Sequence, residues 1–251
     1  MLQEATTLAN SPLLNRLPVL ITAIGGLGTA AFGIVDATKS LGGGLSNRGF
    51  ANIAKTMATL LPDKSVAAAT RSDTSEPAEA PALSLESILV TLKSNWINGV
   101  TSDDQRAIAK SLVKLRLNSA LAVSLGALTG VDKIVLSSVA TKIGSGMPLD
   151  QSETDVYGRF DLVLTTLLDQ AYQRADQQYR NTCKIAAMFV SVGLSVSGTF
   201  SLGHADHNFL SEAGFWQALM VGLLATPLAP IAKDLSSAVQ AGAKAATAWV
   251  K

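Results

Sequence analysis

The feature that most constrains this chain is a set of three long apolar runs that contain no charged side chain. The runs are 18 to 20 residues long and cover Leu17 to Val35, Ile185 to Leu202 and Ala213 to Ala232. A helix needs about 20 residues to cross the hydrocarbon core of a bilayer. The sequence therefore predicts an all-α integral membrane protein with three transmembrane helices, which has the lipid bilayer as its first partner.

The composition agrees with this class. Charged residues make up 16% of the 251 residues and the mean hydropathy is +0.31, whereas soluble domains average about 25% charged residues. The formal net charge of +1 argues against a polybasic surface, so no nucleic-acid partner is expected. The single cysteine, Cys183, excludes an internal disulfide, and we interpret it as a packing residue rather than a reactive thiol.

The glycines of the first run allow a second interpretation. The segment Gly26-Leu27-Gly28-Thr29-Ala30-Ala31 matches the dinucleotide-binding pattern G-x-G-x-x-A. That pattern needs a second strand ending in Asp or Glu about 20 residues later, but Leu45 to Phe50 contains only Arg48 as a charged residue. A helix-packing surface is therefore favoured over a phosphate site, with a signal peptide and a buried soluble helix as further alternatives. Glu4 and the lack of an A-x-A cleavage site disfavour the signal peptide.

Small residues recur about every four positions in all three runs, a spacing that lets helix backbones approach closely in lipid. In the first and third runs the predicted packing positions are Gly25, Gly26, Thr29, Gly33, Ala218, Gly222 and Thr226. In the second run the small residues carry hydroxyl groups, which also suit the wall of a pore. The candidate pore-lining residues are Ser191, Ser195, Ser197, Thr199 and Ser201.

The positions of lysine and arginine predict the orientation. Neither residue occurs between Gly203 and Gly214, whereas both flank the other span ends, with Arg16 as the contrary charge. This places the N-terminus outside and the C-terminus inside, in what we expect to be a bacterial inner (plasma) membrane. The expected segments are an outer N-terminus (1–16), a span (17–35), an amphipathic helix region (36–61), a flexible linker (62–82), a helical cytoplasmic domain (83–184), a span (185–202), an outer loop (203–214), a span (215–232) and a cytoplasmic C-terminal helix (233–251). Pro227 and Pro230 are expected to kink or end the third span.

Capping patterns predict helices within the cytoplasmic domain. A capping box at Thr101 should start one helix that runs through about Leu125. A second box at Ser152 should start a long helix that continues without a break into the second span and ends at Leu202. The uncharged run 117–131 is short for a span, so we expect it to form a buried helix of the domain.

The sequence is poor in candidate chemistry. It contains no G-x-S-x-G, P-loop, C-x-x-C or H-E-x-x-H motif, so neither an enzymatic activity nor a cofactor is expected. Both histidines lie between the second and third spans, where a solvated polar loop is the simpler interpretation. Weak candidates for metal ligands in that loop are His204, Asp206, His207 and Glu212. The spans carry no ionisable side chain, which argues against a coupled transporter or pump.

Two functional hypotheses remain. In the first, the protein is a non-enzymatic membrane anchor or scaffold that forms a homo-oligomer, and its cytoplasmic helical domain recruits or organises a partner complex. In the second, it is a homo-oligomeric channel whose Ser- and Thr-lined pore is formed by the second span and gated by the cytoplasmic helices. Serines in membrane helices more often pack or bond to their own backbone, which favours the anchor.

Overall fold

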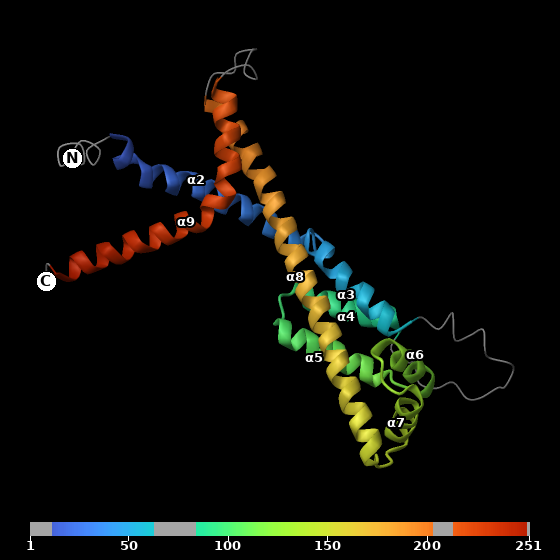
Figure 1. Cartoon of the computed structure of the whole chain (residues 1–251). Coiled ribbons are helices and arrows are strands. Elements are labelled where there is room, and N and C mark those ends of the chain that lie inside the picture. The colour runs from blue at the N-terminus through green and yellow to red at the C-terminus, as the bar shows by residue number, and fades with distance from the viewer. Residues whose placement is uncertain (1–11, 63–83, 203–212, 250–251) are drawn as a thin grey trace. The chain divides into compact units, whose positions relative to one another are not determined.

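The computed structural model describes residues 12–62, 84–202 and 213–249, and within these ranges all regular structure is helical (Figure 1). The described residues form eight α-helices and one short 3-10 helix, and they contain no strand. The predicted all-α class is therefore confirmed. The elements are α2 (Pro12–Ala37), η1 (Thr38–Ser40), α3 (Ser46–Leu60), α4 (Leu85–Ile97), α5 (Ser102–Leu115), α6 (Ser119–Thr129), α7 (Lys133–Ser145), α8 (Gln151–Leu202) and α9 (Ala213–Trp249).

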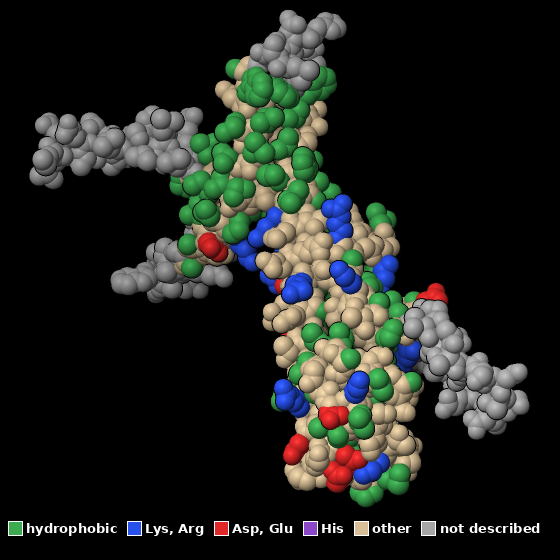
Figure 2. All heavy atoms as spheres, turned by 45° about the vertical axis from the view of Figure 1, so that its right-hand side comes forward, with side chains coloured by type: hydrophobic (Ala, Val, Ile, Leu, Met, Phe, Trp, Pro, Cys, Tyr) green, Lys and Arg blue, Asp and Glu red, His purple; other side chains and the backbone are tan. Residues whose placement is uncertain are grey.

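Three of the described helices are long and apolar enough to cross a membrane, as expected of an integral membrane protein. They contain the segments Pro18–Ser40, Gln151–Ser201 and Ala213–Leu235, with mean hydropathies of 1.5 to 1.8 in their most apolar windows. On the face shown in Figure 2, hydrophobic side chains gather over these helices. Large apolar side chains of these helices, such as Phe189 of α8 and Trp216 of α9, are exposed, which suits contact with lipid.

The chain divides into two compact units. Unit 1 comprises residues 1–45 and 180–251, and unit 2 comprises residues 46–179. The boundary lies within α8, between Tyr179 and Arg180, so one unbroken helix of 52 residues contributes to both units. The prediction of a long helix that continues into the second span is therefore confirmed.

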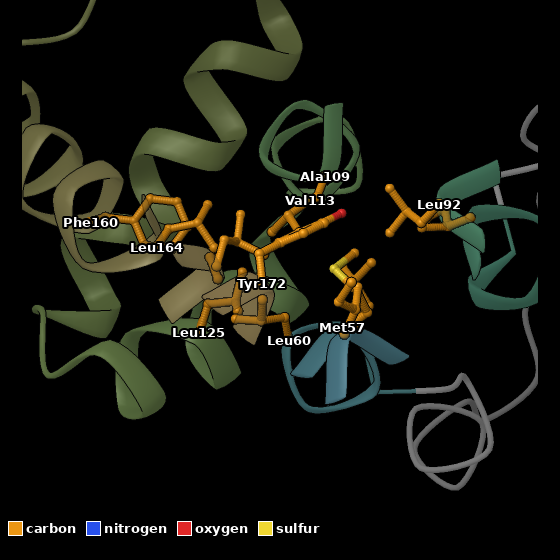
Figure 3. Packing of buried hydrophobic residues seen from close by; sticks show 14 of the residues in the cluster. Met57, Leu60, Leu92, Ala109, Val113, Leu125, Phe160, Leu164 and Tyr172 are labelled. Carbon is orange, nitrogen blue, oxygen red and sulfur yellow. The ribbon is translucent and has the colours of Figure 1, made fainter. Parts of the chain in front are cut away.

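The core of unit 2 is assembled around one face of α8. Its buried side chains recur at three- and four-residue spacing, as expected for a helix that packs along a single stripe. They are Phe160, Leu164, Leu168, Ala171, Tyr172 and Ala175. Helices α3 to α7 cover this stripe, and Figure 3 shows Met57, Leu60, Leu92, Val113 and Leu125 converging on Leu164 and Tyr172. The apolar run 117–131 contributes to this core through one face of α6, which includes Ala122 and Leu125. The expected buried helix is therefore buried on that face alone, because Val123 and Leu128 are each 45% exposed.

The capping box at Thr101 is confirmed, but the expected length of its helix is wrong. The Thr101 side chain accepts a hydrogen bond from the backbone N–H of Asp104, and α5 begins at Ser102. However, α5 ends at Leu115 rather than Leu125, because Asn118 starts a new helix by accepting a hydrogen bond from the N–H of Leu121. Asparagine is among the best N-cap residues, since its side chain replaces a missing backbone acceptor.

The N-terminal cap of α8 lies two residues before the predicted box at Ser152. The N–H of Glu153 donates to Asp150 Oδ1 at 2.9 Å, and the N–H of Asp150 donates back to Glu153 Oε2 at 2.9 Å. Glu153 also accepts hydrogen bonds from Lys142 Nζ at 2.6 Å and Ser138 Oγ at 2.7 Å, both on α7. The bonds from Lys142, the Asp150 backbone and Ser138 lower the pKa of Glu153 to about 2.

This cap makes a prediction about pH. The pKa of Glu153 is about 2 in the folded chain and about 4.3 in an unfolded one, so ionised Glu153 stabilises the fold above about pH 4.3. That stabilisation is lost as the pH falls from about 4.3 towards 2. Glu153→Gln should therefore lower the melting temperature of the detergent-solubilised chain at pH 7, and its difference from wild type should shrink below about pH 4.3. A difference that stays constant down to pH 2.5 would contradict this assignment.

The core of unit 2 makes a second prediction. Leu164 is fully buried, whereas Leu162, on the same helix, is 69% exposed. Leu164→Ala should cost about 2–5 kcal/mol because it removes buried methyl groups and leaves a cavity. Leu162→Ala is the matched control and should change the free energy of unfolding by less than about 0.5 kcal/mol. Denaturant unfolding of both full-length variants in detergent measures the difference, and equal losses would refute the packing described.

Candidate functional site

In unit 1, α2 and α9 approach each other so closely that only glycine fits at two positions of α2. A Cβ atom added to Gly28 would lie 2.1 Å from the carbonyl oxygen of Ala225. One added to Gly25 would lie 2.1 Å from the Cβ atom of Ala232. The order of these contacts shows that the two helices run antiparallel here. Such backbone contact is a typical way to join helices in lipid, where hydrophobicity alone does not drive association.

On the buried face of α9, every residue whose side chain is described is alanine or glycine. Its members are spaced alternately by four and three residues, which is the repeat of closely packed helices. They are Ala218, Gly222, Ala225, Ala229 and Ala232. At Gly222 the neighbour is α8, since an added Cβ atom would lie 2.5 Å from Val192 Cα. The small residues of α9 thus contact α2 at one level and α8 at another.

Ser191 of α8 supplies a polar contact at the same place. Its hydroxyl is fully buried and lies 2.7 Å from the carbonyl oxygen of Gly222 and 2.9 Å from that of Met188, either of which can accept its hydrogen bond. Thr226 Oγ1 lies 3.5 Å away. A buried hydroxyl needs such a partner because no water is present in the bilayer core to replace it. Ser191 therefore joins α8 to the backbone of α9.

The two prolines of α9 lie directly after Thr226 in the sequence and four residues after it. Both Pro227 and Pro230 lie inside the helix, which continues past them to Trp249. They were expected to kink or end the span, and the structure shows a kink, because α9 changes direction along its length without ending (Figure 1). Proline has no N–H to donate to the preceding turn, and this weakens the helix locally.

The contacts of α9 with α2 and α8 lie in one region of unit 1. We call this region, where Gly25 and Gly28 of α2 and Ser191 of α8 meet residues 222–232 of α9, the helix junction.

The structure brings some of the predicted packing residues into the helix junction and leaves others outside it. Gly25 and Gly222 lie in the contacts described, Thr226 lies beside Ser191, and Ala218 is buried on the same face of α9. Gly26 and Gly33 are exposed, with no atom within 4 Å of an added Cβ, and the Thr29 hydroxyl donates to the Gly25 carbonyl of its own helix at 3.0 Å.

Gly28, whose added Cβ atom would approach α9 as closely as that of Gly25, was not among the seven predicted packing positions, although the segment Gly26–Ala31 that contains it was interpreted as a helix-packing surface. The prediction followed a strict four-residue spacing from Gly25, whereas the buried positions of α2 include spacings of three residues. Testing alternate three- and four-residue spacing would have pointed to Gly28.

The hydroxyl groups proposed to line a pore are divided between two surroundings. Ser191 is buried against α9, and Thr199 donates to the Ser195 carbonyl of its own helix at 3.0 Å. Thr199 also contacts α9, because its methyl carbon lies 3.9 Å from a Cβ atom added to Gly214. Ser197 and Ser201 are exposed.

The four weak candidates for metal ligands, His204, Asp206, His207 and Glu212, lie outside the described residues. Within the ranges that are described, no group of three or more His, Cys, Asp or Glu side chains is close enough to hold a metal ion. The predicted linker, 62–82, and outer N-terminus, 1–16, also fall largely outside those ranges.

The charged side chains of unit 2 form a ladder between α5 and α8. Arg106 pairs with Asp169 at 3.1 Å, and Lys110 and Lys114 both pair with Asp161. Burial opposes ionisation of Asp161, but the hydrogen bonds from the two lysines outweigh it and hold the pKa of this carboxyl below its usual range. Because each of these charges has a partner on the facing helix, the ion pairs orient α5 on α8.

The glycines of α2 make a third prediction. Gly28→Ala should force α2 and α9 apart and destabilise the chain by about 1–3 kcal/mol, the usual cost of overpacking. Gly193→Ala, the control on an exposed side of α8, meets open space and should be neutral or slightly stabilising. Unfolding by sodium dodecyl sulfate, followed by circular dichroism, measures both. Equal stability of the two variants would show that α2 and α9 do not pack through Gly28.

No family model matches the chain, and neither a curated protein nor a solved structure was found to be similar to it.

Proposed function

We propose that this protein is a non-enzymatic membrane anchor that forms a homo-oligomer and whose helical unit 2 recruits or organises a partner complex. The helix junction is the observation that carries the proposal. The residues of α9 that are buried there are alanine and glycine, and the junction's one fully buried hydroxyl, Ser191, lies within hydrogen-bond distance of backbone carbonyls. These are the properties of helices that hold one another rather than of a site that binds a solute.

The same hydroxyl groups bear on the channel hypothesis. The proposed pore lining consists of Ser191, Ser195, Ser197, Thr199 and Ser201. The Ser191 hydroxyl instead bonds to the backbone of α9, and the Thr199 hydroxyl donates to its own helix, whereas Ser197 and Ser201 are exposed. The one hydroxyl of this set that is fully buried therefore serves helix packing within the chain. This favours the anchor over the channel.

A second row of small residues on α2 supports the homo-oligomer. Gly26, Ala30, Gly33 and Ala37 are all exposed, and their spacing of four, three and four residues places them along one side of the helix. Nothing lies within 4 Å of an added Cβ at Gly26 or Gly33. A helix from another copy can therefore approach this side as closely as α9 approaches Gly28.

Unit 2 carries the features expected of a recruiting domain. It has its own core, and it also exposes large apolar side chains, of which Leu115 is 71% and Ile134 75% exposed. Exposed apolar side chains that gather into a patch mark surfaces for protein partners. We propose that unit 2 lies on the cytoplasmic side of a bacterial inner membrane, as the distribution of Lys and Arg predicts.

The first experiment is gentle detergent extraction of the tagged full-length protein, followed by mass determination and identification of whatever co-purifies. A homo-oligomer with a stoichiometric protein partner is the expected result. A monomer without a partner would refute the anchor, and ion conductance of the purified protein in planar bilayers would favour the channel.

The exposed row on α2 makes a further prediction. The double variant Gly26→Leu and Gly33→Leu should reduce the extracted homo-oligomer to smaller species, because two bulky side chains block close approach. Gly193→Leu is the control, since Gly193 is also exposed and open but lies on α8. Mass photometry in detergent compares them, and an unchanged mass for the double variant would exclude this side of α2 as a contact.

A further inference from the structure

Unit 2 has an apolar groove that nothing in the described chain fills. The groove lies between α3 and α4 and has a volume of about 280 Å³. Phe50 of α3 forms one wall, and the remaining lining residues all belong to α4. They are Leu85, Glu86, Leu89, Val90 and Lys93.

The α4 residues of the groove are arranged symmetrically. Glu86 and Lys93 are seven residues apart, which is about two helical turns, and the midpoint between them falls between Leu89 and Val90. Val90 is 60% exposed although it is a large apolar side chain. Neither Glu86 nor Lys93 has an ion pair or side-chain hydrogen bond within the described part of the chain. One flank of α4 thus presents an acidic end, an apolar centre and a basic end.

We propose that this groove binds α4 of a second copy of the chain, with the two helices antiparallel about a two-fold axis near Leu89 and Val90. In that arrangement Glu86 of each copy faces Lys93 of the other, so both charges gain a partner. Val90 of each copy enters the groove of the other and contacts Phe50, Leu85 and Leu89.

Charge complementarity selects a second copy over another occupant. A two-fold contact joins the same patch to itself, so a patch can pair in this way only when its acidic and basic ends are exchanged by the rotation. Glu86 and Lys93 meet this condition, whereas a parallel pairing would place like charges opposite each other. Antiparallel helices also pack at 8–10 Å, close enough for Val90 to reach the facing groove.

A single helix pair is small, and the proposal therefore rests on the membrane anchoring proposed above. A stable interface in solution buries about 800 Å² on each partner, which is more than one flank of a 13-residue helix offers. Chains held in the same membrane meet at a much higher effective concentration, and this strengthens a weak contact without further surface.

Exchange of the two charges tests the contact in the full-length protein reconstituted in lipid vesicles. Glu86→Lys and Lys93→Glu, made singly, should each weaken self-association about tenfold, because each places like charges opposite one another. The double variant should restore it, since the pairs then form with opposite polarity. Lys55→Glu on α3, an exposed lysine that does not line the groove, is the control and should leave self-association unchanged.

Cysteine crosslinking tests the position of the axis. In a Cys183→Ala background, Val90→Cys should form an intermolecular disulfide on mild oxidation, because the two copies of this residue lie beside the axis. Thr91→Cys, one residue further and on another side of α4, should not. Failure of Val90→Cys to crosslink would overturn the proposal, because the groove would then be unused. Protection of this cysteine from alkylation in dilute monomeric protein would also overturn it, because another part of the chain would then fill the groove.

The two proposals fail in different ways. An extracted homo-oligomer whose mass and association do not change in either single charge variant would overturn the α4 contact and leave the anchor standing. A wild-type protein that is monomeric in vesicles at all densities would overturn both.

Discussion

The approach of the α9 backbone to the α2 backbone is the interaction on which unit 1 depends. Lipid is as apolar as the side chains it surrounds, so burial of large apolar groups gains little there and close contact must supply the attraction. Dispersion falls steeply with distance, which makes the absence of a Cβ at Gly25 and Gly28 more valuable than any side chain. The hydrogen bond from Ser191 to the Gly222 carbonyl fixes the position of α8 on α9, which nonpolar contacts alone would not do.

Unit 2 depends on a different balance. Large side chains such as Phe160, Leu168 and Tyr172 fill its core, as expected where water drives apolar groups together. Burial raises the pKa of Tyr172 to about 12, and its hydroxyl donates to the Gln105 carbonyl at 3.3 Å, so the phenol stays neutral and bonded within the core. The charged ladder of α5 and α8 then lies on the border of the core and not within it.

The class and the helices were readable from the sequence because they follow from local patterns. Charge-free runs gave the three apolar helices, and the cap at Thr101 marked the start of α5. The break at Asn118 was missed because its neighbours are helix formers, and only the cap itself shows that a new helix begins. The importance of Gly28 was missed for another reason, since a glycine contact is decided by the helix that faces it. The groove beside Val90 likewise depends on Phe50, a residue 40 positions away in the chain.

The buried side chains along α8 decrease in size from one unit to the other. In unit 2 they include the large side chains Phe160, Leu164, Leu168 and Tyr172 beside Ala171 and Ala175, whereas in unit 1 they are Ala187 and Ser191. This change follows from the two solvents. In water a larger buried side chain adds stability, whereas in lipid a smaller one brings a neighbouring backbone closer. The two units should therefore tolerate substitution differently, since a core of large side chains can repack around a volume-conserving change. At the helix junction the facing atoms are backbone atoms, which cannot move aside without moving the helix.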